Sequence, residues 1–218
     1  MLHKTRGIVF KYFKYREASI IVKIFTEAFG VQTYIVNGVR SRSSRNKIAL
    51  YQPLTLVDLV VYHKPEADIN RISEISCNNP FRTLSTDIKK TAIAIFVGEI
   101  LYKSVKEEGE DPVLFDFVFN SIEILDYQGA GYENFHLRFL LKLSKYLGFG
   151  VENSDFFEPF TGEEARLLKS LMEDAYEAPV HLTNMTRRLM LEHIIKFYQA
   201  NVDSLKEINS IKVLQEVL

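Results

Sequence analysis

The first 77 residues alternate apolar and polar positions in the way that is typical of β-strands. β-Branched and aromatic residues are dense here, and Gly30 and a turn around Pro65 separate the runs. The pattern predicts five strands, at residues 5–13, 19–25, 32–36, 54–63 and 70–76. Five short strands in this length are typical of a small closed barrel. The OB-fold is a frequent solution, although an SH3-like barrel would produce much the same pattern.

The pattern changes after Pro80, where apolar residues recur at spacings of three and four and predict helices. One helix is expected to end at Gly148, and another to begin at Thr161 with a capping box completed by Glu164. The predicted helices lie at about residues 88–100, 115–125, 134–147, 162–172, 184–199 and 210–217. We therefore expect an α+β protein, with a five-stranded OB-fold β-barrel in residues 1–80 and an all-α domain in residues 81–218.

Charge is distributed unevenly between these parts. The 218 residues include 27 Lys and Arg and 28 Asp and Glu, which gives a formal net charge of −1. Ten of the basic residues but only two of the acidic ones precede residue 51, so this segment carries +8 and the remainder −9. Such asymmetry indicates that the first segment binds a polyanion, which the net charge of the whole chain conceals.

Composition narrows the class of protein further. The N-terminus lacks the apolar segment of a signal peptide, and apolar stretches such as residues 92–97 are far shorter than the ~18 residues of a membrane span. Cys77 is the single cysteine, so the sequence allows neither an internal disulfide nor a cysteine-based zinc site. We expect a soluble cytoplasmic protein that holds no metal and no cofactor.

The strongest local signal is a basic stretch between the third and fourth predicted strands. Residues 38–47 contain four cations with hydroxyl and amide side chains between them, and Gly38 lets the backbone approach a ligand closely. Arginine presents a planar fork to phosphate oxygens, and serine adds neutral donors. The alternative is a solvated loop kept soluble by its charge. We predict a flexible, sequence-independent phosphate clamp formed by Arg40, Arg42, Arg45 and Lys47.

The predicted strands beside this stretch are also basic. Aromatic residues interleave with cations in residues 10–16, and exposed rings commonly stack on unpaired bases. Tyr12 and Tyr15 are candidates for stacking, although alternation directs about half of such rings into the barrel core. Further contributors to nucleic-acid binding are expected to be Lys4, Arg6, Lys11, Arg16 and Lys23.

Motifs for catalysis are absent from the sequence. It contains no Gly-rich phosphate loop, no Gly-x-Ser-x-Gly and no His-Glu-x-x-His, and its five histidines share no ligand spacing. The acids in residues 107–111 could serve a metal-dependent phosphodiesterase, but an exposed acidic loop explains them better. In residues 134–147, Arg138, Lys142 and Lys145 share one edge of the predicted helix, which is either a solvated face or a patch for a partner's carboxylates.

Several segments carry a resemblance to a known family. Near the N-terminus, residues 5–10 read Thr-Arg-Gly-Ile-Val-Phe, residues 16–22 read Arg-Glu-Ala-Ser-Ile-Ile-Val, and residues 36–40 read Val-Asn-Gly-Val-Arg. Farther along, residues 137–139 read Leu-Arg-Phe and residues 147–151 read Leu-Gly-Phe-Gly-Val. In order and spacing, over nearly the whole chain, these segments resemble the bacterial RecO family of DNA repair mediators.

The resemblance implies a non-enzymatic recombination mediator of the bacterial cytoplasm, associated with the nucleoid. Its N-terminal OB-fold would bind single- and double-stranded DNA and anneal complementary strands. With RecR, it would help to load RecA onto single strands coated by the single-stranded DNA-binding protein SSB. The alternative that we retain from another class is an OB-fold RNA-binding protein of translation or ribosome assembly.

The resemblance also has implications for the helical domain. In the family, this domain receives the acidic, aromatic-ended tail of SSB, and the tail-binding arginine corresponds to Arg138, with Phe139 and Lys142 as neighbours on the helix. Several family members carry a cysteine zinc module after the central helix. Residues 152–161 contain no cysteine, so no zinc is expected in this chain.

Overall fold

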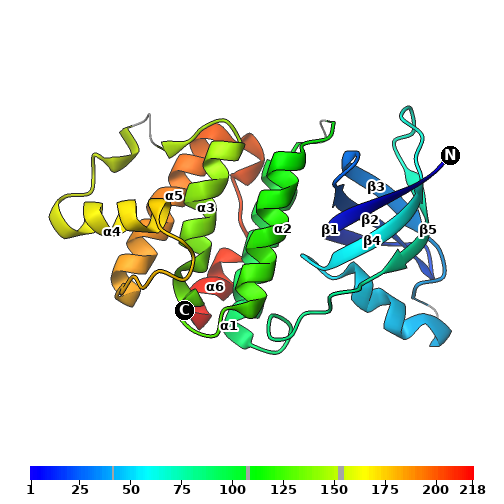
Figure 1. Ribbon diagram of the computed structural model, residues 1–218, viewed down its shortest axis with the longest axis horizontal. Coiled ribbons are helices and arrows are strands. Elements are labelled where there is room, and N and C mark those ends of the chain that lie inside the picture. The colour runs from blue at the N-terminus through cyan, green and yellow to red at the C-terminus, as the bar shows by residue number, and fades with distance from the viewer. Residues whose placement is uncertain (41, 107–108, 152–154) are drawn as a thin grey trace. The chain divides into compact units, whose positions relative to one another are not determined.

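The structure is a computed structural model that describes residues 1–40, 42–106, 109–151 and 155–218, with the backbone alone for residues 42–46 (Figure 1). Its contacts divide the chain into two units. One consists of Met1–Phe81 and Val105–Ile122, and the other of Arg82–Ser104 and Glu123–Leu218. Residues 105–122 thus group with the barrel, and the proposed division into domains at residue 80 remains a prediction.

The first unit contains a closed five-stranded barrel. Its strands are β1 (Leu2–Tyr15), β2 (Ser19–Thr26), β3 (Gly30–Val36), β4 (Leu56–Tyr62) and β5 (Asn70–Ser76). They pair in the order β1-β2-β3-β5-β4, and β4 returns to β1. The pairing of β3 with β5 is parallel and the other four are antiparallel, which confirms the predicted α+β class with a Greek-key barrel of the OB type.

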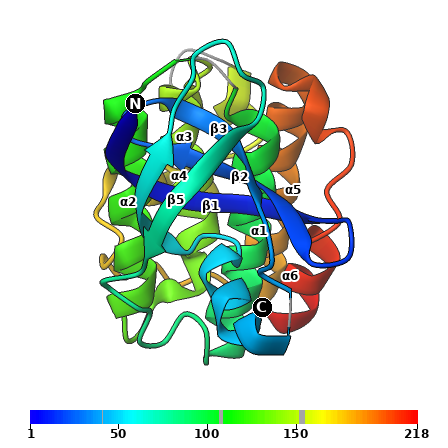
Figure 2. The ribbon, with the colours of Figure 1, turned by 90° about the vertical axis from the view of Figure 1, so that its right-hand side faces the viewer.

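Strand β1 closes the barrel because it pairs with β2 through its second half and with β4 through its first half (Figure 2). Gly7 lies where the two ladders meet, with Thr26 and Val57 as its partners. A Cβ atom on Gly7 would lie 2.8 Å from Ile24 Cγ2 and 2.9 Å from Leu59 Cδ1. The absence of a side chain therefore lets the core fill the point at which β1 changes partners.

The barrel interior follows the predicted alternation in β2. Ile20, Val22 and Ile24 are fully buried in the core of the barrel. Phe25, on the other face of this strand, is also buried, because Phe10 and Phe115 cover it at centroid distances of 5.7 and 5.4 Å. A helical residue far along the chain thus covers part of the barrel's outer face, which alternation within the strand does not reveal.

The basic stretch between β3 and β4 forms a 3₁₀ helix, η1 (Arg42–Tyr51), where the sequence predicts a flexible loop. Tyr51 is buried in the barrel core, and Ile48 and Leu50 pack against it. The prediction of a loop was wrong for this segment because its apolar second half is tied to the core. The sequence thus identified the positive charge of this segment but did not predict its helical conformation.

All six predicted helices are present within a few residues of the expected limits. They are α1 (Ile88–Ser104), α2 (Pro112–Tyr127), α3 (Phe135–Tyr146), α4 (Gly162–Glu173), α5 (Asn184–Asn201) and α6 (Ile211–Val217). Thr183 caps α5 by accepting a hydrogen bond from the Thr186 backbone nitrogen at 3.1 Å. The predicted capping box of α4 is wrong in its bonding, because the Thr161 side chain makes no capping hydrogen bond.

Helix α3 lies at the centre of the second unit, where nine of its twelve residues are buried. The Tyr198 hydroxyl of α5 donates to the Leu140 carbonyl at 2.6 Å. The Glu99 carboxylate of α1 accepts from the Ser210 backbone nitrogen at 2.8 Å and so holds the start of α6. None of the helices that the structure describes is both long and apolar enough to cross a membrane.

Replacing Gly7 by valine should destabilise the protein by about 1–3 kcal/mol, because a branched side chain must displace Ile24 and Leu59 in a filled core. At this chain length, each kcal/mol lowers the melting temperature by about 2–4 °C. Thermal denaturation followed by circular dichroism measures the effect. Gly129→Ala is the control, since a Cβ atom there meets nothing within 4 Å. Equal melting temperatures for the two variants would contradict the packing argument.

Candidate nucleic-acid interface

Two lysines face each other on the outer side of the barrel. Lys11 of β1 is directly opposite Lys23 of β2, which is opposite Thr33 of β3. Their neighbours Tyr12 and Val22 pack into or against the core, so the lysine side chains point outward. This outer row of the barrel therefore concentrates positive charge where an anionic ligand can bind.

A second row beside the lysines is apolar at its centre. Phe13 is opposite Ile21, which is opposite Ile35 of β3, and Ile35 is paired with Arg71 of β5. The side chain of Phe13 is 39% exposed, and the Lys11 ammonium lies 5.3 Å from its ring centroid. This row offers an exposed ring beside a cation, the combination that accommodates a base and its phosphate.

The exposed ring in this row differs from the two that the sequence suggested. Tyr12 packs against the barrel core, and Tyr15 is half-buried with the Arg16 guanidinium 5.2 Å from its ring. The ladder between β1 and β2 shifts register between Val9 and Lys11. Such a bulge re-aims the side chains that follow it, so alternation counted from the start of the strand does not identify Phe13.

Two guanidinium-bearing segments meet at the end of the β1–β2 hairpin. The Arg40 backbone nitrogen donates to the Ala18 carbonyl at 3.0 Å, and its Nη1 donates to the Arg16 carbonyl at 3.2 Å. Arg16 has a φ of 50° and Gly38 a φ of 71°, so both turns use the left-handed region. The structure thus brings Arg16 and Arg40 together, and their use as a common phosphate-binding surface stays a prediction.

A groove lies between the β3–η1 connection and β5. Pairing between β3 and β5 is confined to two residue pairs, and beyond them the groove has a volume of about 530 Å³. Lys47 and Arg71 line it together with one acid, Glu74, and all three are exposed. The sequence did not suggest Arg71 because it lies outside the basic segment, and only barrel closure brings it close. The side chains of Arg42 and Arg45 lie outside the described residues.

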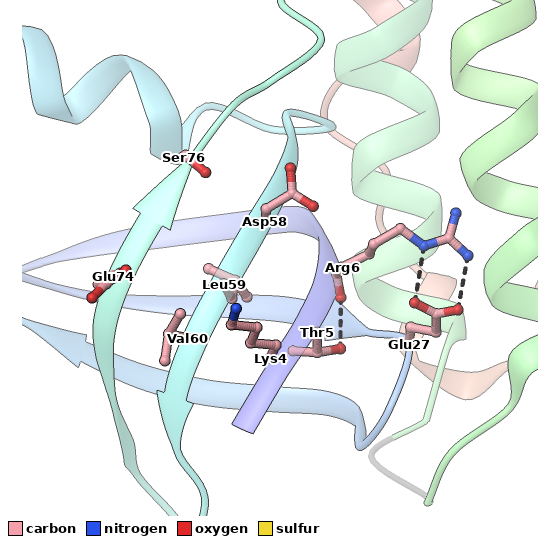
Figure 3. A pocket seen from close by; sticks show the side chains of 9 residues that line it. All are labelled: Lys4, Thr5, Arg6, Glu27, Asp58, Leu59, Val60, Glu74 and Ser76. Atoms are coloured by element: carbon pink, nitrogen blue, oxygen red, sulfur yellow. Dashed lines mark hydrogen bonds and ion pairs between the residues drawn. The ribbon is translucent and has the colours of Figure 1, made fainter. Parts of the chain in front are cut away.

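The remaining two predicted cations of the barrel line a different pocket. This pocket, of about 540 Å³, lies over β1, β4 and β5, and Lys4 and Arg6 share it with the carboxylates of Glu27, Asp58 and Glu74 (Figure 3). Its charge is therefore mixed. The register explains the separation, because the first half of β1 pairs with β4 rather than with β2.

Arg6 is fully engaged within the first unit. Its Nη2 lies 2.8 Å from Glu27 Oε1 and 3.0 Å from Asp116 Oδ1, and its Nε donates to Glu27 Oε2 at 2.9 Å. The guanidinium also lies 5.2 and 4.8 Å from the ring centroids of Phe115 and Phe119. The hydrogen bond with Glu27 raises the pKa of Arg6 and lowers that of the carboxyl. The sequence predicts that Arg6 contributes to DNA binding, but because carboxylates already occupy its guanidinium we expect that contribution to be small.

The helical residues predicted to bind a tail lie beneath other parts of the second unit. Arg138 is 1% exposed, Phe139 is fully buried and Lys142 is half-buried, whereas Lys145 is exposed. The Arg138 guanidinium donates to three carbonyl oxygens, those of Ser170 at 3.2 Å, Asp174 at 3.3 Å and Ala178 at 2.8 Å. Helix α4 and the residues after it therefore cover this edge of α3.

Comparison with known proteins identifies the family. The model "Recombination protein O N terminal" matches residues 1–81, and "Recombination protein O C terminal" matches residues 85–157. The DNA repair protein RecO of Flavobacterium psychrophilum is 34% identical over 98% of both chains. That of Phocaeicola vulgatus is 33% identical over 100% of this chain and 99% of its own. The chain belongs to the RecO family.

Membership of the RecO family confirms the resemblance seen in the sequence and favours DNA repair over the RNA-binding alternative.

The acidic residues 107–111, considered above for a metal-dependent phosphodiesterase, are described in part. Glu107 and Glu108 lie outside the described residues, and the Asp111 carboxylate accepts from the Leu114 backbone nitrogen at 2.9 Å, as a cap for α2. Within the described part of the chain, no three His, Cys, Asp or Glu side chains are placed to hold a metal ion.

Replacing Arg6 by methionine should destabilise the protein by about 1 kcal/mol, because the half-exposed pairs with Glu27 and Asp116 and the ring contacts are lost. Affinity for single-stranded DNA should stay near that of the unaltered protein. Thermal denaturation and fluorescence anisotropy measure the two effects. Lys212→Met removes one charge from an exposed position of the second unit and should leave both unchanged. A larger loss of DNA affinity for Arg6→Met than for Lys11→Met would assign Arg6 to the DNA surface instead.

Proposed function

We propose that this RecO-family protein is a non-enzymatic recombination mediator that binds single- and double-stranded DNA without sequence specificity and anneals complementary strands. The observation that carries the proposal is the opposition of Lys11 and Lys23 on the outer face of the barrel. Two lysines side by side concentrate positive charge on this face, and phosphate groups bind such a surface with release of counterions. The family's place among DNA repair proteins supports DNA as the ligand.

The proposed surface extends from this row in two directions. Arg16 and Arg40 continue it at the end of the β1–β2 hairpin, and Lys47 and Arg71 continue it at the groove beside β5. These cations suit phosphate oxygens and carry no information about base sequence. Phe13, at the centre of the apolar row, supplies a face for an unpaired base.

Annealing follows from such a surface. Cations that neutralise phosphates reduce the repulsion between two strands, while base edges remain free to pair. In the bacterial cytoplasm, together with RecR, the protein would help to load RecA onto single strands coated by SSB. Capture of the acidic SSB tail is assigned to Arg138, Phe139 and Lys142, which requires the residues that cover them to move.

Replacing Lys11, Lys23, Arg40 and Lys47 together by alanine should abolish annealing and weaken DNA binding. If about five phosphates are neutralised, the slope of log affinity for single strands against log salt is about −3.5, and loss of four contacts brings it to about −0.7. Fluorescence anisotropy across a salt series gives the slope, and a strand-annealing assay on SSB-coated DNA gives the activity.

The matched control removes the same charge from the second unit, through alanine at Lys169, Lys196, Lys206 and Lys212, all of them exposed. It should keep both the salt slope and the annealing activity. If the control loses DNA affinity as strongly as the barrel variant, binding depends on net charge and the proposed surface is wrong.

Replacing Phe13 by alanine should weaken single-strand binding by about 1–3 kcal/mol, the value of one base stacked on an aromatic side chain, and leave double-strand binding nearly unchanged. The reason is that bases in a duplex are already stacked. Binding of matched single- and double-stranded oligonucleotides provides the comparison. Tyr62→Ala, which removes a 48% exposed ring on β4, should affect neither ligand. Equal losses with both ligands would exclude stacking at Phe13.

A further inference from the structure

Among the residues that the structure describes, two cations on α3 have only backbone carbonyl groups as hydrogen-bond partners. Besides its bond to Ala178, Arg138 reaches the carbonyls of Ser170 and Asp174, and the Lys142 ammonium donates to the Met172 carbonyl at 2.8 Å. No carboxylate among the described residues forms an ion pair with either nitrogen group. Burial lowers the pKa of Arg138, and burial together with the charge of Arg138 lowers that of Lys142. The carboxylates of Asp174 and Glu177 attract Arg138 electrostatically, but the pair is buried with no described carboxylate hydrogen-bonded to it.

The carbonyl groups come from the C-terminal end of α4 and the residues that follow it. The last carbonyls of a helix lack partners within the helix, and they carry the negative end of its dipole. The segment Ser170–Ala178, called the cover below, therefore satisfies the cations with partial charges. In return, Arg138 and Lys142 cap α4.

An aromatic residue fixes the cover in place. The Tyr176 ring stacks on Phe135 at a centroid distance of 4.8 Å, and the Lys142 ammonium lies 5.9 Å from its centre. Tyr176 is 8% exposed, although both its neighbours in the chain, Ala175 and Glu177, are exposed. The cover thus places one ring in a slot on α3 and carries three acidic residues around it, which are Glu173, Asp174 and Glu177.

The cover has one further polar anchor, because the Gln128 side chain donates to the Tyr176 carbonyl at 3.2 Å, and its apolar anchoring is limited. Only Leu168 and Leu171 of α4 are buried, whereas α3 buries nine residues, and α4 begins without a side-chain cap. Segments that bury little apolar surface open locally at low free-energy cost. A carboxylate also attracts these desolvated cations with a full negative charge, whereas each carbonyl offers only a partial one. An acidic ligand would therefore gain more from the pair than the cover does.

We propose that Ser170–Ala178 is a displaceable cover that competes with an acidic, aromatic-containing peptide for Arg138, Lys142 and the slot of Tyr176. The inference rests on the proposed function, because it describes the regulation of the tail-binding edge of α3. In the closed state the chain's own ring and carbonyl groups occupy the edge. In the open state carboxylates of the peptide bond the two cations, and its ring takes the place of Tyr176 beside Phe135.

The test compares Tyr176→Ala with the unaltered full-length protein. The probe is a fluorescein-labelled hexapeptide with three aspartates and a C-terminal phenylalanine, and anisotropy measures its binding. Loss of the ring raises the open fraction, and apparent affinity rises in proportion, so we expect tighter binding by about tenfold. The double variant Tyr176→Ala with Arg138→Met should lose the binding again. Tyr127→Ala, a 59% exposed ring elsewhere in the second unit, should bind the peptide as the unaltered protein does.

Hydrogen exchange on the unaltered protein keeps the inference testable if Tyr176→Ala fails to fold. Added peptide should speed exchange of the cover amides and slow exchange in α3 around Arg138. Peptide binding that leaves the cover amides as protected as before would overturn the inference, as would a folded Tyr176→Ala variant of unchanged or lower affinity. Absence of peptide binding in every variant would also overturn it, while intact annealing in the same preparations would leave the proposed DNA function standing.

Discussion

Closure of the barrel through β1 is the constraint on which the N-terminal unit depends. One strand must pair with β2 along one part and with β4 along another, and Gly7 belongs to both ladders. The outward residues of its two halves therefore acquire different neighbours. Arg6 lies opposite Asp58, whereas Lys11 lies opposite Lys23. A single run of basic residues in the sequence is thus divided between two surfaces of different charge.

Cations that are partly or fully buried have different kinds of partner in this protein. Arg6 is held by two carboxylates and two rings, and Lys90, 2% exposed in the second unit, donates to the Thr83 hydroxyl at 2.6 Å and to the Asp126 carbonyl at 2.9 Å. The pKa of Lys90 is lowered by burial, against the attraction of the Asp126 carboxylate. Arg138 differs from both because its hydrogen-bond partners, among the described residues, are carbonyl groups alone. The carboxylates of Asp174 and Glu177 attract it without forming an ion pair, so an acidic ligand would add the ion pair that the closed state does not have.

Much of the fold was predictable because strand and helix periodicity act over short distances. The five strands and six helices follow from alternation and from spacings of three and four, and Ile20, Val22 and Ile24 are inward as the pattern requires. What could not be predicted depends on contacts between distant segments. Phe115 covers Phe25, a bulge re-aims the residues after Val9, and α4 covers an edge of α3 that reads as solvent-exposed.

The same limit applies to the candidate site. Arg16 and Arg40 could be selected from charge alone, but Arg71 could not, since only the parallel pairing of β3 with β5 brings it beside Ile35. Local density of charge finds cations that are close in sequence. It does not find cations that only strand pairing brings together. It also does not distinguish Lys11 from Arg6, whose guanidinium is already paired with carboxylates.

The uneven charge of the sequence acquires its meaning on the folded barrel. Acidic residues beyond residue 50 also belong to the barrel, on β4 and β5. Asp58 and Glu74 of these strands line the pocket that contains Lys4 and Arg6. The β1–β2–β3 face receives no acid in its paired rows. Because charges farther apart than the Debye length, about 10 Å at 0.1 M salt, are largely screened, a DNA strand responds to the face it touches rather than to the chain's net charge of −1. A nearly neutral protein can therefore present a surface that favours a polyanion, provided that registry keeps the acids of β4 and β5 away from Lys11 and Lys23.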